Sequence, residues 1–517
     1  MAPLDMKPNE LEPYWVPFTA NRAFKKRPRM FVGAKDKHYF KPDGAKVLDA
    51  TSGLFCVNAG HCREPIVKAI QEMAARLDYA PAFQYGHPKV FELASRLSLL
   101  APGDLDYAFF SNSGSEAVDT ARRGGWGSLV VAVPSHTAVR GTEAGERLLR
   151  HAALCGYRYA RYLSEVPNGG LHRAEVLPPR GEEQAYRSAL GLARAIAAGV
   201  VTTRDLANSP PNEATPAWME DRCRELAASR GLEIEVVQGE ELDRRGMGGL
   251  AAVGRGAASP PRLVRLRKAG RGRKVALVGK GVTFDTGGIS IKPAADMDEM
   301  KYDKGGACAV FGAVQVAVDL DLSVDLSAYL PLAENALDSG SYRPGDILRL
   351  ANGKTVEILN TDAEGRLILG DALAWAVADG AESLVEVSTL TGGCAIALGP
   401  HAAGLFTPDD ELAAELLAVG EASGDRLWRL PLWPEYLEEM RGTHADLKNT
   451  AGRLGSAATA AAFLSQFVGD LHSWAHLDIA GVVSDKGDKG ARGATGFGVS
   501  LLASWLRRCA ATSSSAT

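Results

Sequence analysis

Apolar residues recur at helical spacing in several parts of the first 210 residues. The segments with this spacing are 64–77, 89–99, 143–163 and 184–208. Because apolar positions every three to four residues give a helix one buried face, we predict a helix in each segment. The last helix ends before Pro210 and Pro211, since proline cannot continue a helix. Glycines interrupt the helical pattern at residues 122–128, and residues 129–134 predict a strand.

Short apolar runs alternate with helical segments in the second half of the chain. The runs predicted to be buried strands are Lys274–Gly279, 322–330, 383–389 and 474–479. The helices predicted around them are 306–317, 370–378 and 457–467. Strands that alternate with helices form a layered α/β fold with helices on both faces of a sheet. In such folds, binding and catalytic residues gather at the carboxyl ends of the strands.

The amino-acid composition limits the classes of protein to which this chain can belong. A chain of 517 residues with 46% hydrophobic and 23% charged residues is long enough for two or three globular domains. The net charge of −4 disfavours a dedicated binder of nucleic acid or anionic membranes. Seven cysteines without a C-x-x-C pair indicate free thiols, and no apolar run reaches the roughly 18 residues of a membrane span. We therefore expect a cytoplasmic location and no membrane partner.

Charged side chains interrupt the apolar pattern just after the strand at Lys274–Gly279. Lys280 and Asp285 follow that strand on a glycine-rich loop, and Lys292 and Asp303 come later. An ammonium at Lys292 would stabilise negative charge that develops on a substrate. Lys280 would ligate a metal only as the neutral amine, which requires a strongly lowered pKa.

A second charged motif, N-T-D-A-E-G-R, contains Asp362, Glu364 and Arg366. Residues two apart share a face in extended backbone, so we expect these three side chains to point the same way. Together with Asp285 and Asp303, the two carboxylates would balance two divalent cations such as zinc, manganese or magnesium. For the short motif alone, a solvated charged turn is the alternative.

Several motifs resemble signatures of the leucyl aminopeptidase family, the cytosolic two-metal exopeptidases. The matching segments are VGKGVTFDTGGISIKP, MKYDKGGA, NTDAEGRLILGDAL, WAHLDIAG and GATGFGV. The resemblance extends from about residue 146 to residue 508. It implies a mixed sheet between helices, an α/β/α catalytic domain. It also implies hydrolysis of the N-terminal residue of peptides, with a leucine-type preference, and assembly as a homo-oligomer that is usually a hexamer.

The resemblance also assigns roles to individual residues. The implied metal ligands are Lys280, Asp285, Asp303, Asp362 and Glu364. Asp285 and Glu364 would bridge two divalent ions, zinc or manganese. Lys292 and Arg366 would be catalytic without binding metal: the lysine polarises the scissile carbonyl, and the arginine holds a bicarbonate ion that acts as general base. Residues implied to line the pocket for the first side chain are Met300, Thr389 and Gly392.

One residue beside the implied site departs from the family pattern. Lys304 follows Asp303 at a position where the family commonly has methionine. An ammonium group directed at the metals would weaken their binding, whereas one directed outward would have no effect. The sequence leaves both alternatives open.

The N-terminal part resembles a different family, the class III aminotransferases close to the β-alanine–pyruvate transaminases. The matching segments are YWVPFTANRAF, VLDATSGLFCVNAGH, DYAPAFQYGHP and FFSNSGSEAVDTA. Residues 112–116 correspond to the family's turn for the phosphate of pyridoxal phosphate, although an ordinary helix cap has the same pattern. The later segments with the Schiff-base lysine have no match here. Without that lysine the cofactor has no covalent anchor, and we therefore predict no transaminase activity; whether residues 1–121 bind pyridoxal phosphate stays open.

These resemblances divide the chain into four predicted parts. Residues 1–121 would be an α+β aminotransferase-like fragment, and residues 122–183 a truncated α/β remnant of the aminopeptidase's own N-terminal domain. Residues 184–509 would be the catalytic domain, and residues 510–517 a disordered tail of small polar residues. The rivals to a peptidase are an inactive or scaffold fusion protein, including one that binds nucleic acid, and, least favoured, a transaminase.

Overall fold

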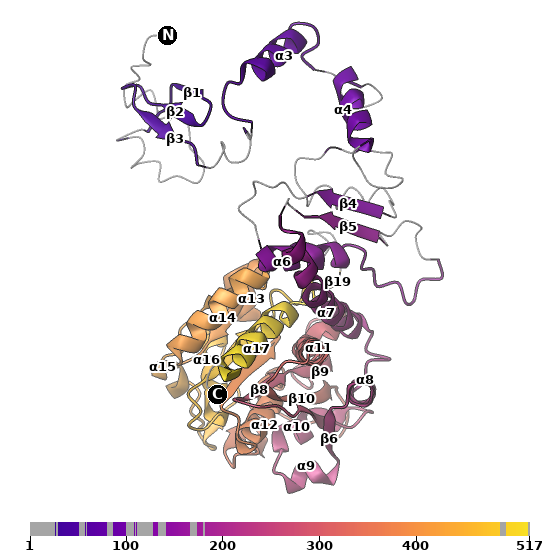
Figure 1. Cartoon of the computed structure of the whole chain (residues 1–517). Helices are drawn as coiled ribbons and strands as arrows, with labels where there is room; N and C mark the ends of the chain where they lie inside the picture. The colour runs from indigo at the N-terminus through magenta and orange to yellow at the C-terminus, as the bar shows by residue number, and fades with distance from the viewer. Residues whose placement is uncertain are drawn as a thin grey trace. The chain divides into compact units, whose positions relative to one another are not determined.

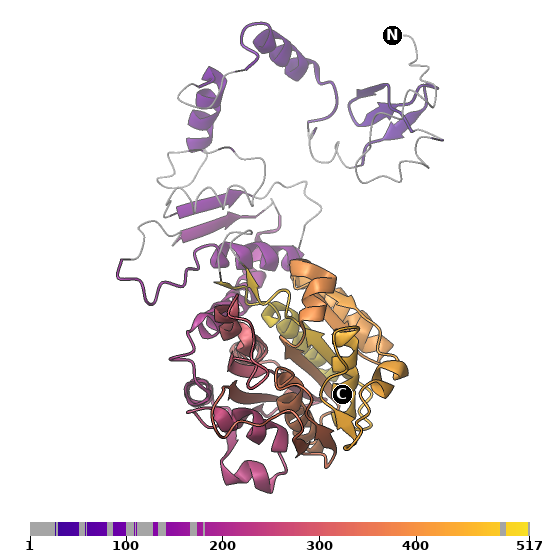
Figure 2. The same cartoon turned by 180° about the vertical axis from the view of Figure 1, so that it is seen from behind.

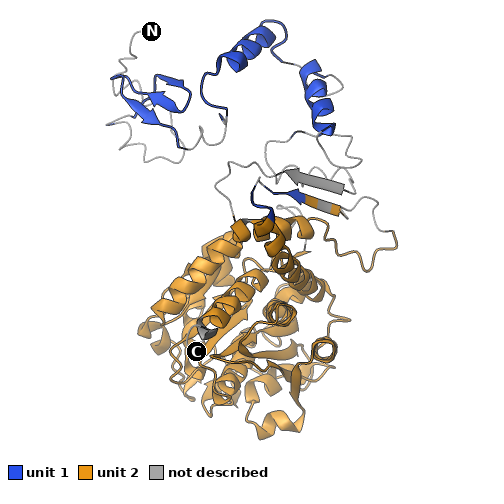
Figure 3. Ribbon diagram, in the orientation of Figure 1, with its two compact units in different colours: residues 1–120, 130–140, 176–183 blue, residues 121–129, 141–175, 184–517 orange. Residues whose placement is uncertain are grey.

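The computed structural model covers the whole chain and forms two compact units (Figure 3). The residues that it describes are 26, 29–50, 57, 59–79, 86–99, 108, 110, 128–132, 141–165, 173–178, 181–485 and 493–514. Unit 1 comprises Met1–Thr120, Val130–Arg140 and Val176–Glu183; unit 2 comprises Ala121–Leu129, Gly141–Glu175 and Gln184–Thr517. The segment 122–183, predicted as one remnant, is thus divided between the units.

Unit 1 contains a small antiparallel sheet and two amphipathic helices in its described part. The sheet has the order β1 (Gly33–Lys35), β2 (His38–Phe40), β3 (Lys46–Leu48), and the helices are α3 (Glu64–Ala74) and α4 (Pro88–Ser98). The predicted helices at 64–77 and 89–99 are confirmed. Neither helix buries any of its side chains, and Ile70 and Phe91 are 63% and 66% exposed. Their apolar faces therefore stabilise the fold little, because burial of apolar area is the main favourable contribution to folding.

Helix α6 (Gly141–Leu154) is held in unit 2 by a buried arginine. The Arg150 Nε donates to Glu146 at 2.7 Å, and its Nη atoms donate to the Ser500 hydroxyl at 3.2 Å and the Ser423 carbonyl at 3.0 Å. Because all three acceptors are buried with it, Arg150 fixes α6 to the rest of unit 2. The helix ends nine residues before the predicted boundary at 163. The strands β4 (Ser128–Ala132), which precedes α6, and β5 (Arg173–Leu177), which follows it, form a two-stranded sheet.

A nine-stranded mixed sheet forms the centre of unit 2. Its order is β15 (Leu427–Arg429), β14 (Ala403–Phe406), β17 (Trp474–Asp478), β13 (Ser383–Ser388), β8 (Lys274–Gly279), β10 (Asp325–Asn335), β7 (Arg262–Lys268) and β6 (Glu233–Gln238), with β9 (Gly281–Asp285) also paired to β10. The inner strands β17, β13, β8 and β10 are parallel, whereas β14 and β7 are antiparallel to their inner neighbours. The expected mixed sheet is confirmed.

Helices cover both faces of this sheet (Figures 1 and 2). On one face lie α7 (Glu183–Asn208), α8 (Pro216–Arg230), α11 (Gly305–Asp319), α14 (Asp410–Ser423) and α17 (Val499–Ser514); on the other lie α9 (Glu240–Arg244), α10 (Gly248–Val253), α12 (Gly365–Ala378) and α16 (Ser456–Leu464). Side chains alternate between these layers along each strand. In β8, for example, Val275 and Leu277 join the first core while Ala276 and Val278 join the second.

Shorter elements complete unit 2. They are β11 (Ile347–Arg349), β12 (Thr355–Glu357), β16 (Leu447–Lys448), β18 (Ser484–Asp485), β19 (Gly493–Ala494), α13 (Gly392–Leu398), α15 (Pro434–Glu438), and the 3-10 helices η2 (Gly254–Gly256), η3 (Met297–Lys304), η4 (Gly399–His401) and η5 (Ser465–Phe467). The helix α17 continues to Ser514, so part of the segment 510–517, predicted to be disordered, is helical. Among the described residues, no helix is both long and apolar enough to cross a membrane.

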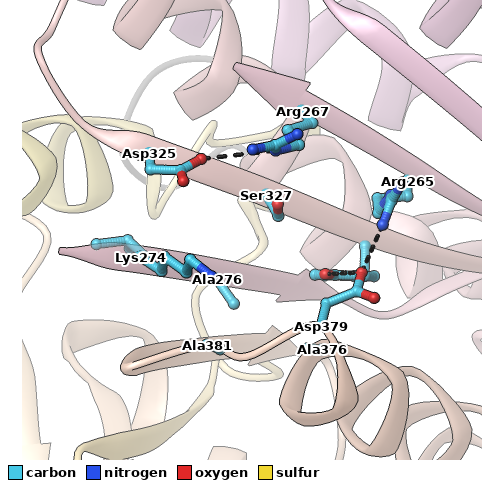
Figure 4. A pocket seen from close by; sticks show the side chains of 11 residues that line it. Arg265, Arg267, Lys274, Ala276, Asp325, Ser327, Ala376, Asp379 and Ala381 are labelled. Atoms are coloured by element: carbon cyan, nitrogen blue, oxygen red, sulfur yellow. Dashed lines mark hydrogen bonds and ion pairs between the residues drawn. The ribbon is translucent and has the colours of Figure 1, made fainter. Parts of the chain in front are cut away.

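A pocket of about 260 Å³ lies at the amino ends of β8 and β10, beside the last turn of α12 (Figure 4). Arg265 pairs there with Asp379 at 2.6 Å and with Glu235 at 2.7 Å, and the Tyr329 hydroxyl donates to Asp379 at 2.6 Å. The charges in this pocket therefore compensate one another. Functional sites of such sheets lie at the opposite, carboxyl ends of the strands.

Candidate metal centre

The loops at the carboxyl ends of β8, β9 and β13 bring the predicted site residues together. Lys280 follows β8, and its N–H and carbonyl bond to Val387 and Ala307 at 3.0 and 2.8 Å. After Asp285 at the end of β9, the chain turns through Gly287 and Gly288, whose φ angles of 86° and 64° favour glycine. The loop then returns to the cluster at Lys292, whose N–H donates to the Thr286 carbonyl at 2.9 Å.

Three buried carboxylates form the centre of the site. Asp285, Asp303 and Glu364 each offer one oxygen, and these oxygens lie within 4.8 Å of one another. They come from β9, from η3 and from the residue before α12, and each is at most 7% exposed. Burial together with mutual repulsion raises the pKa of Asp285 and Asp303. Carboxylates packed this closely require positive charge between or beside them.

Lys280 supplies part of that positive charge. Its Nζ lies 2.8 Å from Asp303 Oδ2 and 2.9 Å from Glu364 Oε1, and it donates to the Thr389 carbonyl at 3.2 Å. Although burial opposes its ionisation, Asp303 and Glu364 hold the pKa of Lys280 above its usual value. Without metal, Lys280 is therefore an ammonium group, and it becomes a possible metal ligand only when it loses a proton.

Lys292 links Asp362 to the cluster. Its Nζ lies 2.8 Å from Asp285 Oδ2 and also pairs with Asp362 Oδ1. Burial, and then the charge of Asp285, raise the pKa of Asp362 to about 6. Lys292 is only partly buried, with 20% of its side chain exposed. Its ammonium is therefore positioned between the acidic cluster and solvent, where a substrate would approach.

The predicted common face for Asp362, Glu364 and Arg366 is wrong. Asp362 lies in a turn, and α12 begins at Gly365, so the backbone is not extended here. Asp362 and Glu364 consequently meet different lysines, Lys292 and Lys280. Arg366 lies in the first turn of α12. The helix begins five residues before the predicted start at residue 370.

Buried atoms without a hydrogen-bond partner indicate that the site fits a bound cation and an anion. In the described part of the chain, Glu364 Oε2 accepts no hydrogen bond, and Arg366 Nε and Nη1 donate none. Burial lowers the pKa of Arg366 to about 10, so the group remains a cation at neutral pH. A buried, unpaired carboxylate oxygen is costly, whereas hard divalent cations prefer such ligands. The donor set therefore fits divalent metal ions, and the two free N–H groups fit an oxyanion.

The residues implied to contact substrate are placed as follows. The Thr389 hydroxyl donates to Asp303 Oδ1 at 2.6 Å, so Thr389 lies against the acidic cluster. Met300 is half-buried in η3, three residues before Asp303. Gly392 is the first residue of α13, and a Cβ atom there would meet open space. A substrate pocket formed by these three residues stays a prediction.

Sequence reasoning missed one residue of the site, Asn335. Its Nδ2 donates to Asp285 Oδ1 at 2.8 Å and to the Thr361 carbonyl at 3.1 Å, and its side chain is buried. Asn335 therefore orients an acidic residue of the cluster and fixes the turn that leads to Asp362. Asn335 ends β10, five residues beyond the predicted strand 322–330, so the sequence prediction gave no signal for it.

Lys304 points away from the acidic cluster. Its buried Nζ donates to the carbonyls of Lys301, Ser209 and Ala207 at 2.5, 3.0 and 3.2 Å. Burial without a close carboxylate lowers the pKa of Lys304 to about 8. Of the two alternatives left open by the sequence, the geometry therefore favours the one in which Lys304 leaves the metal site intact.

The Lys304→Met variant tests this assignment through stability. Because the folded pKa lies below the unfolded value of about 10.4, the unfolded chain binds more protons between these values, and stability rises with pH there. Between pH 8 and about 10.5, the wild type is expected to gain about 3 kcal/mol relative to the methionine variant. Urea unfolding across this pH range measures the difference, and equal pH profiles would contradict it. Manganese affinity is expected to stay unchanged.

Comparison with known proteins identifies the family. The model for the cytosol aminopeptidase family, catalytic domain, matches residues 201–503, and the model for aminotransferase class-III matches residues 20–126. A probable cytosol aminopeptidase of Methylobacillus flagellatus is 46% identical over 358 residues, 68% of this chain and 72% of the relative. One from a Geobacter species is 41% identical over 425 residues, 80% and 86% of the respective chains.

A solved structure agrees with these relatives. The bottromycin maturation enzyme BotP in complex with Mn matches with a TM-score of 0.71 and 38% identity, covering 77% of this chain and 87% of that one. Both predicted resemblances, including the aminotransferase-like N-terminal segment, are confirmed. The chain therefore belongs to the cytosol aminopeptidase family.

Proposed function

We propose that this protein is a metal-dependent aminopeptidase that removes the N-terminal residue from peptides, with a leucine-type preference. The observation that carries the proposal is the buried cluster of Asp285, Asp303 and Glu364, with oxygens within 4.8 Å of one another. It lies at the carboxyl ends of the central strands in a chain that is 41–48% identical to probable cytosol aminopeptidases.

Five residues would hold two divalent ions in this proposal. They are Lys280, Asp285, Asp303, Asp362 and Glu364. Asp285 and Glu364 each contribute an oxygen to the cluster, and as the resemblance implies, both ions would share these two residues. When bound, the ions would supply an activated water and polarise the scissile carbonyl. Zinc or manganese is proposed, and the manganese named with BotP supports the latter.

Lys292 and Arg366 would act on the substrate from two sides. The partly exposed ammonium of Lys292 would donate to the carbonyl oxygen of the scissile bond and stabilise the negative charge that develops there. The two free, buried N–H groups of Arg366 would bind bicarbonate, which would accept a proton during attack. Because α12 fixes the position of Arg366, the arginine would hold the bicarbonate ion in one orientation.

The site would select substrates with a free amino terminus. The acidic residues attract the positive charge of a free amino group, and a free amino group can also bind a metal ion. The nitrogen of a blocked amino terminus is an amide, which carries no charge and does not bind the metal. Met300, Thr389 and Gly392 are proposed to contact the first side chain. We further propose a homo-oligomer, a hexamer as in the resembled family.

Hydrolysis of leucine p-nitroanilide by the purified full-length chain tests the function. With added manganese or zinc, the protein is expected to turn over this substrate but not its N-acetylated form. The Asp362→Ala, Glu364→Ala double variant is the inactive control. Soluble, metal-loaded wild-type protein that leaves leucine p-nitroanilide intact would refute the proposal and favour an inactive fusion protein.

Residues 1–140 are expected to be dispensable for catalysis. A chain of residues 141–517 retains α6 and its Arg150 contacts, together with the nine-stranded sheet and the metal centre. Its kcat for leucine p-nitroanilide is therefore expected to lie within about threefold of the full-length value. Circular dichroism would first establish that the shortened chain is folded. A folded but inactive truncation would show that the removed residues contribute to the activity.

A transaminase is the less favoured alternative. Residues 112–116, which resemble a phosphate-binding turn, lie outside the described residues. The aminotransferase model ends its match at residue 126, so the segment that would carry the cofactor's lysine has no counterpart. The absorbance spectrum of the purified protein with added pyridoxal phosphate separates the two functions, since a Schiff base would produce a distinct band.

A further inference from the structure

Asp478, the last residue of β17, contacts the turn that borders the proposed metal centre. Its buried Oδ1 accepts hydrogen bonds from the N–H groups of Leu390, Thr391 and Ala480 at 3.2, 3.4 and 3.2 Å. Its Oδ2 accepts the hydroxyl of Thr391 at 2.6 Å. Four donors thus converge on one carboxylate, and hydrogen bonds to a charged acceptor are about twice as strong as neutral ones.

The turn held by Asp478 leads directly to the metal ligands. Two residues before Thr391, the Thr389 hydroxyl donates to Asp303 Oδ1 at 2.6 Å, and the Thr389 carbonyl accepts from Lys280 at 3.2 Å. The Thr391 hydroxyl oxygen also accepts the N–H of Cys394 at 3.1 Å and so caps α13. A displaced turn would therefore move two groups that orient Asp303 and Lys280.

We propose that Asp478 is a positioning residue that fixes the turn 389–391 against the metal ligands. The inference rests on the proposed function. A carboxylate is required because it only accepts hydrogen bonds, whereas an amide would present an N–H₂ group to one of the four donors.

Two substitutions test this role. Asp478→Asn replaces one acceptor oxygen by an N–H₂ group and keeps the other oxygen for the backbone N–H groups. Thr391→Val keeps the shape of the side chain and removes the hydroxyl that links the turn to Asp478. The matched control is Asp371→Asn, because Asp371 is also fully buried and accepts backbone N–H groups, from Leu250 and Ala351 at 2.8 Å each, remote from the turn.

The readouts are the manganese dissociation constant by titration calorimetry, kcat and KM for leucine p-nitroanilide, and the unfolding temperature. Groups that orient metal ligands typically contribute 10- to 100-fold to affinity or activity, so both test variants are expected to raise the manganese dissociation constant about tenfold. At saturating manganese, kcat of both variants is expected to return to within about threefold of wild type, because excess metal offsets the weakened binding.

The control variant is expected to lose stability without change in manganese affinity or kcat. Asp478→Asn with manganese affinity and kcat within twofold of wild type would overturn the inference, as would losses no larger than those of Asp371→Asn. An inactive wild type would refute the proposed function instead. In that case the manganese titration still tests the positioning of the turn.

Discussion

Replacing Glu364 with alanine is expected to lower the turnover of leucine p-nitroanilide by about 1,000-fold or more and to reduce the bound manganese per chain. Glu364 Oε1 pairs with Lys280 at 2.9 Å, while Oε2 has no hydrogen-bond partner among the described residues. Its loss removes an oxygen proposed to be shared between two ions. Metal analysis after dialysis and steady-state kinetics measure the two effects.

The matched control for this variant is Glu220→Ala. Glu220 is equally a buried glutamate of unit 2 paired with cations, Arg262 at 2.5 Å and Arg224 at 2.6 Å, but it lies on α8. Breaking this buried pair is expected to lower the unfolding temperature and leave metal content and kcat unchanged. If Glu364→Ala kept its manganese and more than a tenth of its activity, the assigned metal centre would be wrong.

Replacing Arg366 with lysine is expected to lower kcat by about 100-fold while the metal content stays at the wild-type value. The reason is geometric. The guanidinium offers two buried N–H groups, Nε and Nη1, in one rigid plane, whereas a lysine offers a single flexible ammonium that cannot hold an oxyanion in the same orientation. Kinetics at saturating substrate and manganese isolate this effect from metal binding.

Arg150→Lys is the corresponding control. Arg150 is also a buried arginine of unit 2, with hydrogen bonds to Glu146, Ser423 and Ser500, but it holds α6 in place. This variant is expected to lose stability and retain kcat. A kcat within threefold of wild type for Arg366→Lys would show that the orientation of an oxyanion at this position does not limit the reaction.

Sequence patterns predicted the strands around the site more accurately than the backbone conformation of the segments between them. The strand Lys274–Gly279 was predicted with both ends correct, because a fully buried parallel strand is a continuous apolar run. Asp285 was expected on the loop that follows this strand, whereas the ligand role of Asp303, which lies in η3, was implied by the family resemblance. For residues 362–366 the prediction failed, because three charged residues conceal the start of α12, whose first buried apolar side chain is Leu367.

Sequence patterns could not predict contacts between residues that lie far apart along the chain. Asn335 and Asp478 each end a strand and hold a loop that is distant along the chain. A polar residue at the end of a strand is common, and nothing in one sequence indicates its partner. The direction of the Lys304 side chain was equally undetermined, since its acceptors at Ala207 and Ser209 lie almost a hundred residues upstream.

The attachment of α6 has an evolutionary consequence. Because Arg150 secures this helix to unit 2 by buried contacts with Ser423 and Ser500, the chain from residue 141 onward contains α6, the contacts that hold it and the central sheet. Gene fusions upstream of that position would change the leading segment and spare the chemistry. Recombination at this junction could therefore replace the N-terminal segment and preserve peptidase activity, so selection for that activity would not remove the fusion.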